Sequence, residues 1–303
     1  MTTISDPSAM TPEDPRWLSW FMQRRRFDRL SRKAQTGASL ITDFAAGVYE
    51  MGYPGQRRGS YELSDIVKVS RSTGGGIINQ IGQFEWVGND VPRLDYDPVT
   101  LQPLGILIEE QRTNLLPYSS DFTNPEWTKI GASVSANAVN AVDGTLSADK
   151  IVEGASTGRH DATSNTVTAA ATQYTASMYL KAGERNWVKL RLGASGILEG
   201  AWFDLATGAI GTINAGYSAS IRDEGGGWYR CSVTFTAPAG NIFVGIHPCA
   251  VDGSINYTGD GTSGIYIWGA QLEAGPFATS YIPTEASQVT RAADAASVTT
   301  LSP

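Results

Sequence analysis

At 303 residues the chain is long enough for two domains, and 41% of its residues are hydrophobic while only 17% are charged. With 33 glycines and 10% aromatic residues, this composition favours an all-β module over a helical enzyme. The formal net charge of −7 disfavours nucleic-acid binding by the body of the chain. Because the sequence has no long apolar run, we expect neither a cleavable N-terminal export signal nor membrane insertion.

Residues 1–35 are expected to form an N-terminal anchoring helix. Thr11 or Asp14 can cap its start with a proline in the first turn, and no helix breaker follows before Gly37. The segment carries seven basic residues against four acidic ones, and the cations crowd its later turns, where the helix dipole favours them.

An aromatic stripe on this short terminal helix is expected to dock into another subunit or into copies of the same chain. The alternatives are that the stripe packs back on its own protein or lies on a membrane surface. The residues assigned to this anchoring and partner-binding stripe are Trp17, Trp20, Phe21, Arg24, Phe27 and Leu30.

Residues 36–117 are predicted to form a β-rich stalk or oligomerisation region. The predicted strands cover 48–49, 62–69, 77–81, 84–87 and 104–109. Each is too short and too often interrupted by glycine to bury a core alone, so a head domain or other chains must complete them. Glu110 and Arg112 share a strand face and are expected to pair across a subunit contact. Glu109 and Glu110 point to opposite faces, which disfavours an acid/base pair.

Residues 118–285 change to regular alternating strands and predict a two-sheet antiparallel sandwich. The predicted strands cover 130–134, 149–152, 163–168, 174–180, 187–192, 201–205, 217–222, 229–235, 242–246 and 265–272. Cys231 falls in phase with the apolar residues of its strand and is predicted to be buried. A Cys231–Cys249 disulfide is left open, and residues 286–303 form a C-terminal tail.

Several polar and aromatic side chains of the head are predicted to point outward, because their strand neighbours form the inward apolar set. An outward Trp beside charged groups suits sugar recognition, since a pyranose stacks on an aromatic ring while charged groups bind its hydroxyls or carboxylates. Alternatively, loops, the tail or the stalk cover these aromatics. The predicted glycan-binding residues are Trp187, Lys189, Arg191, Trp202, Asp204 and His247.

Enzyme signatures are missing from the sequence, and we do not expect an enzyme. With His160 and His247 as its two histidines, the chain has no HExxH motif, and it has neither a GxSxG elbow nor a Walker loop. A glycosidase needs two carboxylates held several ångströms apart, which a sequence alone does not exclude.

Seven segments carry a resemblance to a known family. They are DFAAGVY (43–49), VKVSRSTGG (67–75), NDVPRLDYDP (89–98), GILIEEQRTNLLPYSSDF (105–122), GWYRCSVTFTAP (227–238), GDGTSGIYIWGAQLEAGPFATSYIPT (259–284) and TRAAD (290–294). Over roughly residues 40–295 the chain resembles virion fibre and head-spike proteins of bacteriophages and gene-transfer-agent particles. The resemblance implies a jelly-roll head similar to carbohydrate-binding modules, following a short fibre-forming region.

The resemblance further implies a protein made in the bacterial cytoplasm and carried on the surface of a virion or phage-like particle. The resemblance implies three kinds of partner. The N-terminal helix would bind other virion proteins, and the chain would associate with copies of itself, with a trimer favoured. The head would bind host capsular or surface polysaccharide. The alternatives are a purely structural decoration component and a polysaccharide depolymerase.

Jelly-roll heads of this kind often hold a structural Ca²⁺, and no other cofactor is expected. The oxygen ligands available near the first and last strands of the head are Asp121, Glu126, Asp149 and Glu273. A hard cation needs six or more oxygens and no dense DxDxDG loop occurs, so the metal is left open.

Overall fold

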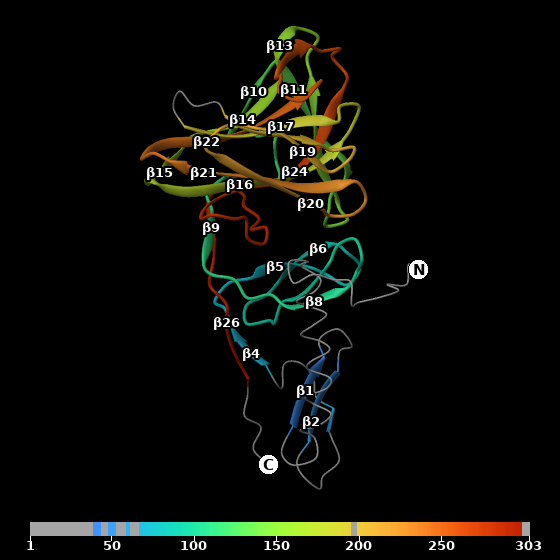
Figure 1. Ribbon diagram of the computed structural model, residues 1–303, viewed down its shortest axis with the longest axis vertical. Coiled ribbons are helices and arrows are strands. Elements are labelled where there is room, and N and C mark those ends of the chain that lie inside the picture. Colours follow the sequence, from blue (N-terminus) through green and yellow to red (C-terminus); the bar gives the residue numbers. More distant parts are fainter. Residues whose placement is uncertain (1–38, 44–47, 53–58, 61–66, 195–198, 299–303) are drawn as a thin grey trace. The chain divides into compact units, whose positions relative to one another are not determined.

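The computed structural model describes residues 39–43, 48–52, 59–60, 67–194 and 199–298 (Figure 1). The predicted N-terminal helix and its docking stripe lie outside these ranges. The chain divides into two compact units, residues 1–68 with 298–303 and residues 69–297. Within the described ranges, no helix is long and apolar enough to cross a membrane.

In the first unit three strands form an antiparallel sheet. They are β1 (Ser39–Asp43), β2 (Val48–Gly52) and β3 (Gly59–Ser60), in that order. The strand predicted at 48–49 is therefore present as the start of β2.

The second unit contains a sandwich of two antiparallel sheets. The first, here called the β17 sheet, has the order β10 (Trp127–Ile130), β14 (Asp161–Ser164), β22 (Gly240–Cys249), β17 (Trp187–Ala194), β18 (Gly200–Asp204) and β19 (Ala209–Ile213), with β15 (Val167–Ala169) also paired to β22. The second, the β21 sheet, has the order β11 (Ala132–Asn140), β12 (Leu146–Glu153), β24 (Gly264–Ala274), β16 (Thr172–Ala182), β21 (Trp228–Ala237) and β20 (Tyr217–Asp223). Figure 1 shows the two sheets stacked face to face.

The strand order is that of a jelly roll. One layer has the central order β12-β24-β16-β21, and the facing layer has the order β14-β22-β17-β18. The chain therefore crosses repeatedly between the two sheets. Alternate residues of both sheets enter one core, among them Ile151, Met178, Leu190, Val233 and Ile246, all fully buried. The predicted sandwich is confirmed.

Each of the ten strands predicted for the head overlaps an observed strand. The segment predicted as one strand at 130–134 is two, because Gly131 takes a φ of +60° between β10 and β11. β19 was not predicted, since its residues are mostly exposed and show no apolar alternation. Cys231 is buried as predicted, and Cys231 and Cys249 are both free thiols, on strands of different sheets.

The remaining described strands form short hairpins and two-stranded ribbons. Their pairs are β4 (Val67–Ser70) with β26 (Ala295–Val298), β5 (Gly75–Ile78) with β6 (Phe84–Val87), β7 (Leu94–Tyr96) with β8 (Pro103–Ile106), β9 (Arg112–Asn114) with β25 (Val289–Arg291), and β13 (Thr157–Arg159) with β23 (Asn256–Thr258). Residues 69–117, assigned above to the stalk, thus lie in the same unit as the sandwich.

An aromatic cluster fixes the β5–β6 hairpin to the outer face of the β21 sheet. The ring of Phe84 lies 5.7 Å from that of Trp268 and 5.4 Å from that of Tyr281, and Tyr179 joins from β16. Gly269 allows this packing: its φ is +62°, and a Cβ there would lie 2.8 Å from the Tyr179 ring. One end of the outer face is therefore covered.

A buried ion network ties residues 71–109 to the C-terminal segment. Asp294 binds Arg93 and, at 2.7 Å, Arg71, while Glu109 lies 2.6 Å from Arg93 and 3.4 Å from Arg291. Burial alone would raise the pKa of Asp294, but hydrogen bonds from Arg93 and Arg71 lower it. Four of the segments that carry the family resemblance thus meet in one structural contact.

The Glu110–Arg112 pair forms within the chain rather than across a subunit contact. The Arg112 guanidinium donates to the Glu110 carboxylate, and the Glu110 side chain is 60% exposed. Residues 110 and 112, two positions apart, thus pair with each other inside one chain, and a contact across subunits stays a prediction.

Candidate functional site

The structure brings all six predicted glycan-binding residues to the outer face of the β17 sheet. Trp187 pairs with Asp204 across β17 and β18, and Lys189 pairs with Trp202 on β18 and with His247 on β22. Arg191 follows two residues after Lys189 on the same face. The strand alternation read from the sequence was therefore correct in phase.

Four of the six are buried, which contradicts the expectation that they are exposed. Lys189 is 3% exposed, Trp202 5%, Arg191 2% and His247 0%. The cations lie over aromatic rings: the Lys189 ammonium is 4.0 Å from the Trp202 ring centre, and the Arg191 guanidinium is 4.9 Å from that of Phe243. These side chains cover one another instead of presenting a free aromatic face.

The other two predicted residues are only half-buried. The Trp187 ring contacts β19, where a Cβ added to Gly211 would lie 2.6 Å from that ring. Asp204 has a local role, because its carboxylate accepts from the Ala206 N–H and the Thr207 hydroxyl and so closes the turn after β18.

Asp161 completes the buried polar cluster on this face. One of its carboxylate oxygens lies 3.6 Å from Nε2 of His247 and 3.5 Å from Nε of Arg159. Burial, followed by the charges of Arg191 and Lys189, lowers the pKa of His247 well below its usual value, so the imidazole is neutral. Arg191 donates to the Thr163 hydroxyl at 3.2 Å.

An open groove of 330 Å³ lies instead on the outer face of the β21 sheet; we call it the β20–β21 groove. Its floor is a ladder of polar pairs that the register sets directly opposite one another: Ser218 with Thr234, Ser220 with Ser232, and Arg222 with Arg230. The alternating partners Ala219, Ile221, Cys231 and Val233 face the core. The floor is thus polar because the other face of the same strands is apolar.

The wall of the groove is the segment that follows β24. Pro276, Phe277 and Ala278 line it, and the Phe277 ring is 55% exposed, with the Arg112 guanidinium 5.3 Å from its centre. The Thr234 hydroxyl bonds to that of Thr175 at 2.7 Å and thereby joins the floor to β16. The groove combines an exposed aromatic ring with a row of hydroxyls.

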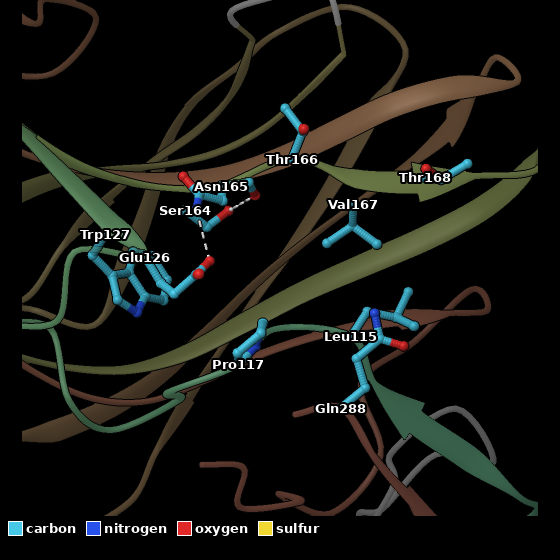
Figure 2. Close-up of a pocket in the computed structure, with 10 residues that line it drawn as sticks. All are labelled: Leu115, Pro117, Glu126, Trp127, Ser164, Asn165, Thr166, Val167, Thr168 and Gln288. Carbon is cyan, nitrogen blue, oxygen red and sulfur yellow. Dashed lines mark hydrogen bonds between the residues drawn. The ribbon is translucent and has the colours of Figure 1, made fainter. Parts of the chain in front are cut away.

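A second cavity, of 310 Å³, lies beside the turn between β14 and β15 (Figure 2). Leu115, Pro117 and Val167 give it an apolar side. Its polar groups bond mainly to one another: the Asn165 amide donates to the Glu126 carboxylate at 2.7 Å, and the Ser164 hydroxyl donates to the Asn165 carbonyl at 2.9 Å, as the dashed lines in Figure 2 show. Unlike the β20–β21 groove, this cavity has no exposed aromatic ring in its lining.

The four possible Ca²⁺ ligands are engaged elsewhere. The carboxylate of Asp149 accepts the N–H groups of Phe122 and Asn137, and that of Glu273 accepts from Thr279. Asp121 closes a local turn by accepting from Thr123, and Glu126 binds Asn165. In the part of the chain that the structure describes, no three acidic, histidine or cysteine side chains form a metal-binding group.

The groove residues are not among the predicted glycan-binding residues, because outward tryptophans occur in the strands of the β17 sheet. The alternation in 217–222 and 229–235 already placed Ser218, Ser220 and Arg222, and Ser232 and Thr234, on the face opposite the apolar set. The signal in the sequence was the glycine-rich turn between the two strands, which predicts a hairpin and so brings the two polar rows together.

No protein-family model and no curated protein matches the chain. Among solved structures, a CBM35 from Paenibacillus barcinonensis is 13% identical over 50% of this chain and 96% of its own, with a TM-score of 0.29. The CBM22-1 xylan-binding domain of Xyn10C from the same organism is 11% identical over 55% of this chain and 94% of its own, with a TM-score of 0.31. These scores are too low to establish a shared fold, so the sandwich assignment rests on the strand order described above.

Proposed function

We propose that the chain is a glycan-binding spike or fibre protein of a virion-like particle and that the β20–β21 groove holds the glycan. The observation that carries this proposal is the geometry of the groove, in which the exposed Phe277 ring stands beside cross-strand hydroxyl and arginine pairs. A sugar needs these two kinds of contact, an aromatic face for its C–H groups and donors or acceptors for its hydroxyls.

The shape of the site supports a polymer rather than a small metabolite. The floor lies on the outer face of two long antiparallel strands, and Ser218 and Ser220 are exposed along it. A shallow site of this kind binds weakly, and several copies on one particle would raise the effective concentration. We therefore include self-association in the proposal, with a trimer as the expected form.

The particle context draws its support from the sequence resemblance. In this proposal residues 1–35 anchor the chain to other virion proteins, and the sandwich binds capsular or other surface polysaccharide of the host. The chain acts as an adhesin without catalysing a reaction.

The proposal is tested by applying the purified full chain to an array of bacterial surface polysaccharides. We expect binding to a subset of glycans, and we expect particles that lack the chain to attach less well to cells displaying that subset. No binding on the array, together with normal attachment by such particles, would support a purely structural component instead. Release of reducing ends from a bound polysaccharide would contradict the non-enzymatic role and indicate a depolymerase.

A further inference from the structure

We infer that the β20–β21 groove is built for an acidic polysaccharide whose carboxylates bind between Arg222 and Arg230. The inference rests on the proposed function and adds the chemical class of the ligand.

The two arginines face each other directly across β20 and β21. Like charges in this cross-strand position destabilise a sheet, and an anion placed between them removes the repulsion. Both arginines line the groove, and both also line a neighbouring cavity of 120 Å³, which shares Ala278 with the groove. The positive pair therefore lies where the two hollows meet.

Of the two arginines, Arg222 forms an ion pair with Glu224 among the described residues, and Arg230 forms none. Nε of Arg222 donates to the Glu224 carboxylate at 2.7 Å, whereas Arg230 donates to the Ser177 hydroxyl at 3.0 Å and lies over the Tyr179 ring at 5.2 Å. Nε of Arg230 is buried, whereas Nη1 is not buried and makes no hydrogen bond among the described residues. Arg230 thus retains a donor that a carboxylate in the groove can reach.

The other nearby carboxylates already accept hydrogen bonds from the chain itself. Asp95, which lines the smaller cavity, accepts the Ile78 N–H at 2.7 Å, and Glu273 accepts the hydroxyl of Thr279 at 2.8 Å. Burial raises the pKa values of Asp95, Glu273 and Glu224, while the charges of the arginines act on these carboxylates in the opposite direction. A ligand carboxylate can then engage the guanidinium fork in the bidentate geometry that arginine favours.

The experiment compares acidic polymers with the same polymers after their carboxylates are converted to methyl esters. The probes are polygalacturonate, alginate and hyaluronan, titrated against the full chain by calorimetry. We expect at least one acid form to bind roughly tenfold or more tightly than its ester, because charge-assisted hydrogen bonds are about twice as strong as neutral ones.

Arg230→Gln should remove this preference while leaving weak binding of the ester. The matched control is Lys150→Gln. It removes one positive charge from β12, near the opposite edge of the same sheet, and should keep the preference for the acid form. If Arg230→Gln does not fold, judged by its thermal transition, the acid-to-ester ratio of the unaltered protein still decides the question.

Equal binding of acid and ester, or failure of all three acid polymers to bind, would overturn the inference. Binding of neutral polysaccharides that depends on Phe277 would in that case leave the proposed function standing. Absence of binding to any glycan, acidic or neutral, would defeat both.

Discussion

Individual side chains of the sandwich show where sequence reasoning succeeds and where it ends. Alternation placed Lys189, Trp202 and His247 on the outer face of their sheet, as the register confirms. It did not predict that they are buried, because burial there depends on cation–π contacts between strands that are distant in the sequence. Which outward face is open is decided by tertiary packing.

His247 is expected to make stability depend on pH. Its folded-state pKa lies well below the usual value of 6.5, so the unfolded chain takes up the proton first. The stability linked to His247 is complete above the unfolded pKa and is lost as pH falls below it, by at most about 1.4 kcal/mol per pH unit. His247→Gln should flatten the fall in unfolding free energy between pH 7 and pH 5, measured by urea denaturation.

Four charged groups surround His247 and enter this prediction. Lys189, Arg191 and Arg159 disfavour the imidazolium, while Asp161 lies 3.6 Å from it. Burial raises the pKa of Asp161, which favours the folded state as pH falls and so acts in the opposite direction. The informative quantity is therefore the difference between the two proteins at each pH. Identical pH profiles would contradict the account.

Among the secondary-structure elements, two of the short strands of residues 67–117 depend on partners far away in the sequence. β9 pairs with β25 and β4 pairs with β26, both from the C-terminal segment. The sequence indicated that these strands need neighbours. It did not identify them, because a three- or four-residue strand has too little pattern to specify its register.

The buried ion network should stabilise this part of the molecule. Glu109→Gln removes one of the two carboxylates, Glu109 and Asp294, that neutralise the buried Arg93 and Arg291, and should lower the unfolding free energy by about 3 kcal/mol. Glu110→Gln, at the adjacent exposed position, should lower it by less than about 1 kcal/mol. Chemical denaturation of the two variants at pH 7 measures both effects.

The same network gives the expected behaviour in acid. Burial alone would raise the pKa of Glu109, but the charge of Arg291 and hydrogen bonds from Ser280 lower it below 4.5. Its contribution is complete above that value and is lost as pH falls through the lower folded-state pKa, so the Glu109→Gln variant should lose less stability on acidification. Equal stability of the two variants at pH 7 would mean that the network is not a structural tie.

For the whole molecule, the fold class was more predictable than the place of the site. Regular alternation and turn spacing were enough to predict a two-sheet sandwich, and the strand order agrees. The position of the groove could not be predicted in the same way, because it depends on which segments cover the outer face of each sheet. The Phe84, Trp268 and Tyr281 cluster closes one end of the β21 sheet, and the region over Ser218 and Ser220 stays open.

The most direct test of glycan binding in this groove is a titration of the strongest ligand from the array against two alanine variants. Phe277→Ala removes the exposed ring of the groove, and Trp86→Ala removes an exposed ring, 40% accessible, on β6 outside it. Loss of a stacking contact of about 1.4 kcal/mol corresponds to a tenfold rise in Kd, so we expect roughly that change for Phe277→Ala and none for Trp86→Ala. An unchanged Kd for Phe277→Ala would contradict the assignment of the glycan to this groove.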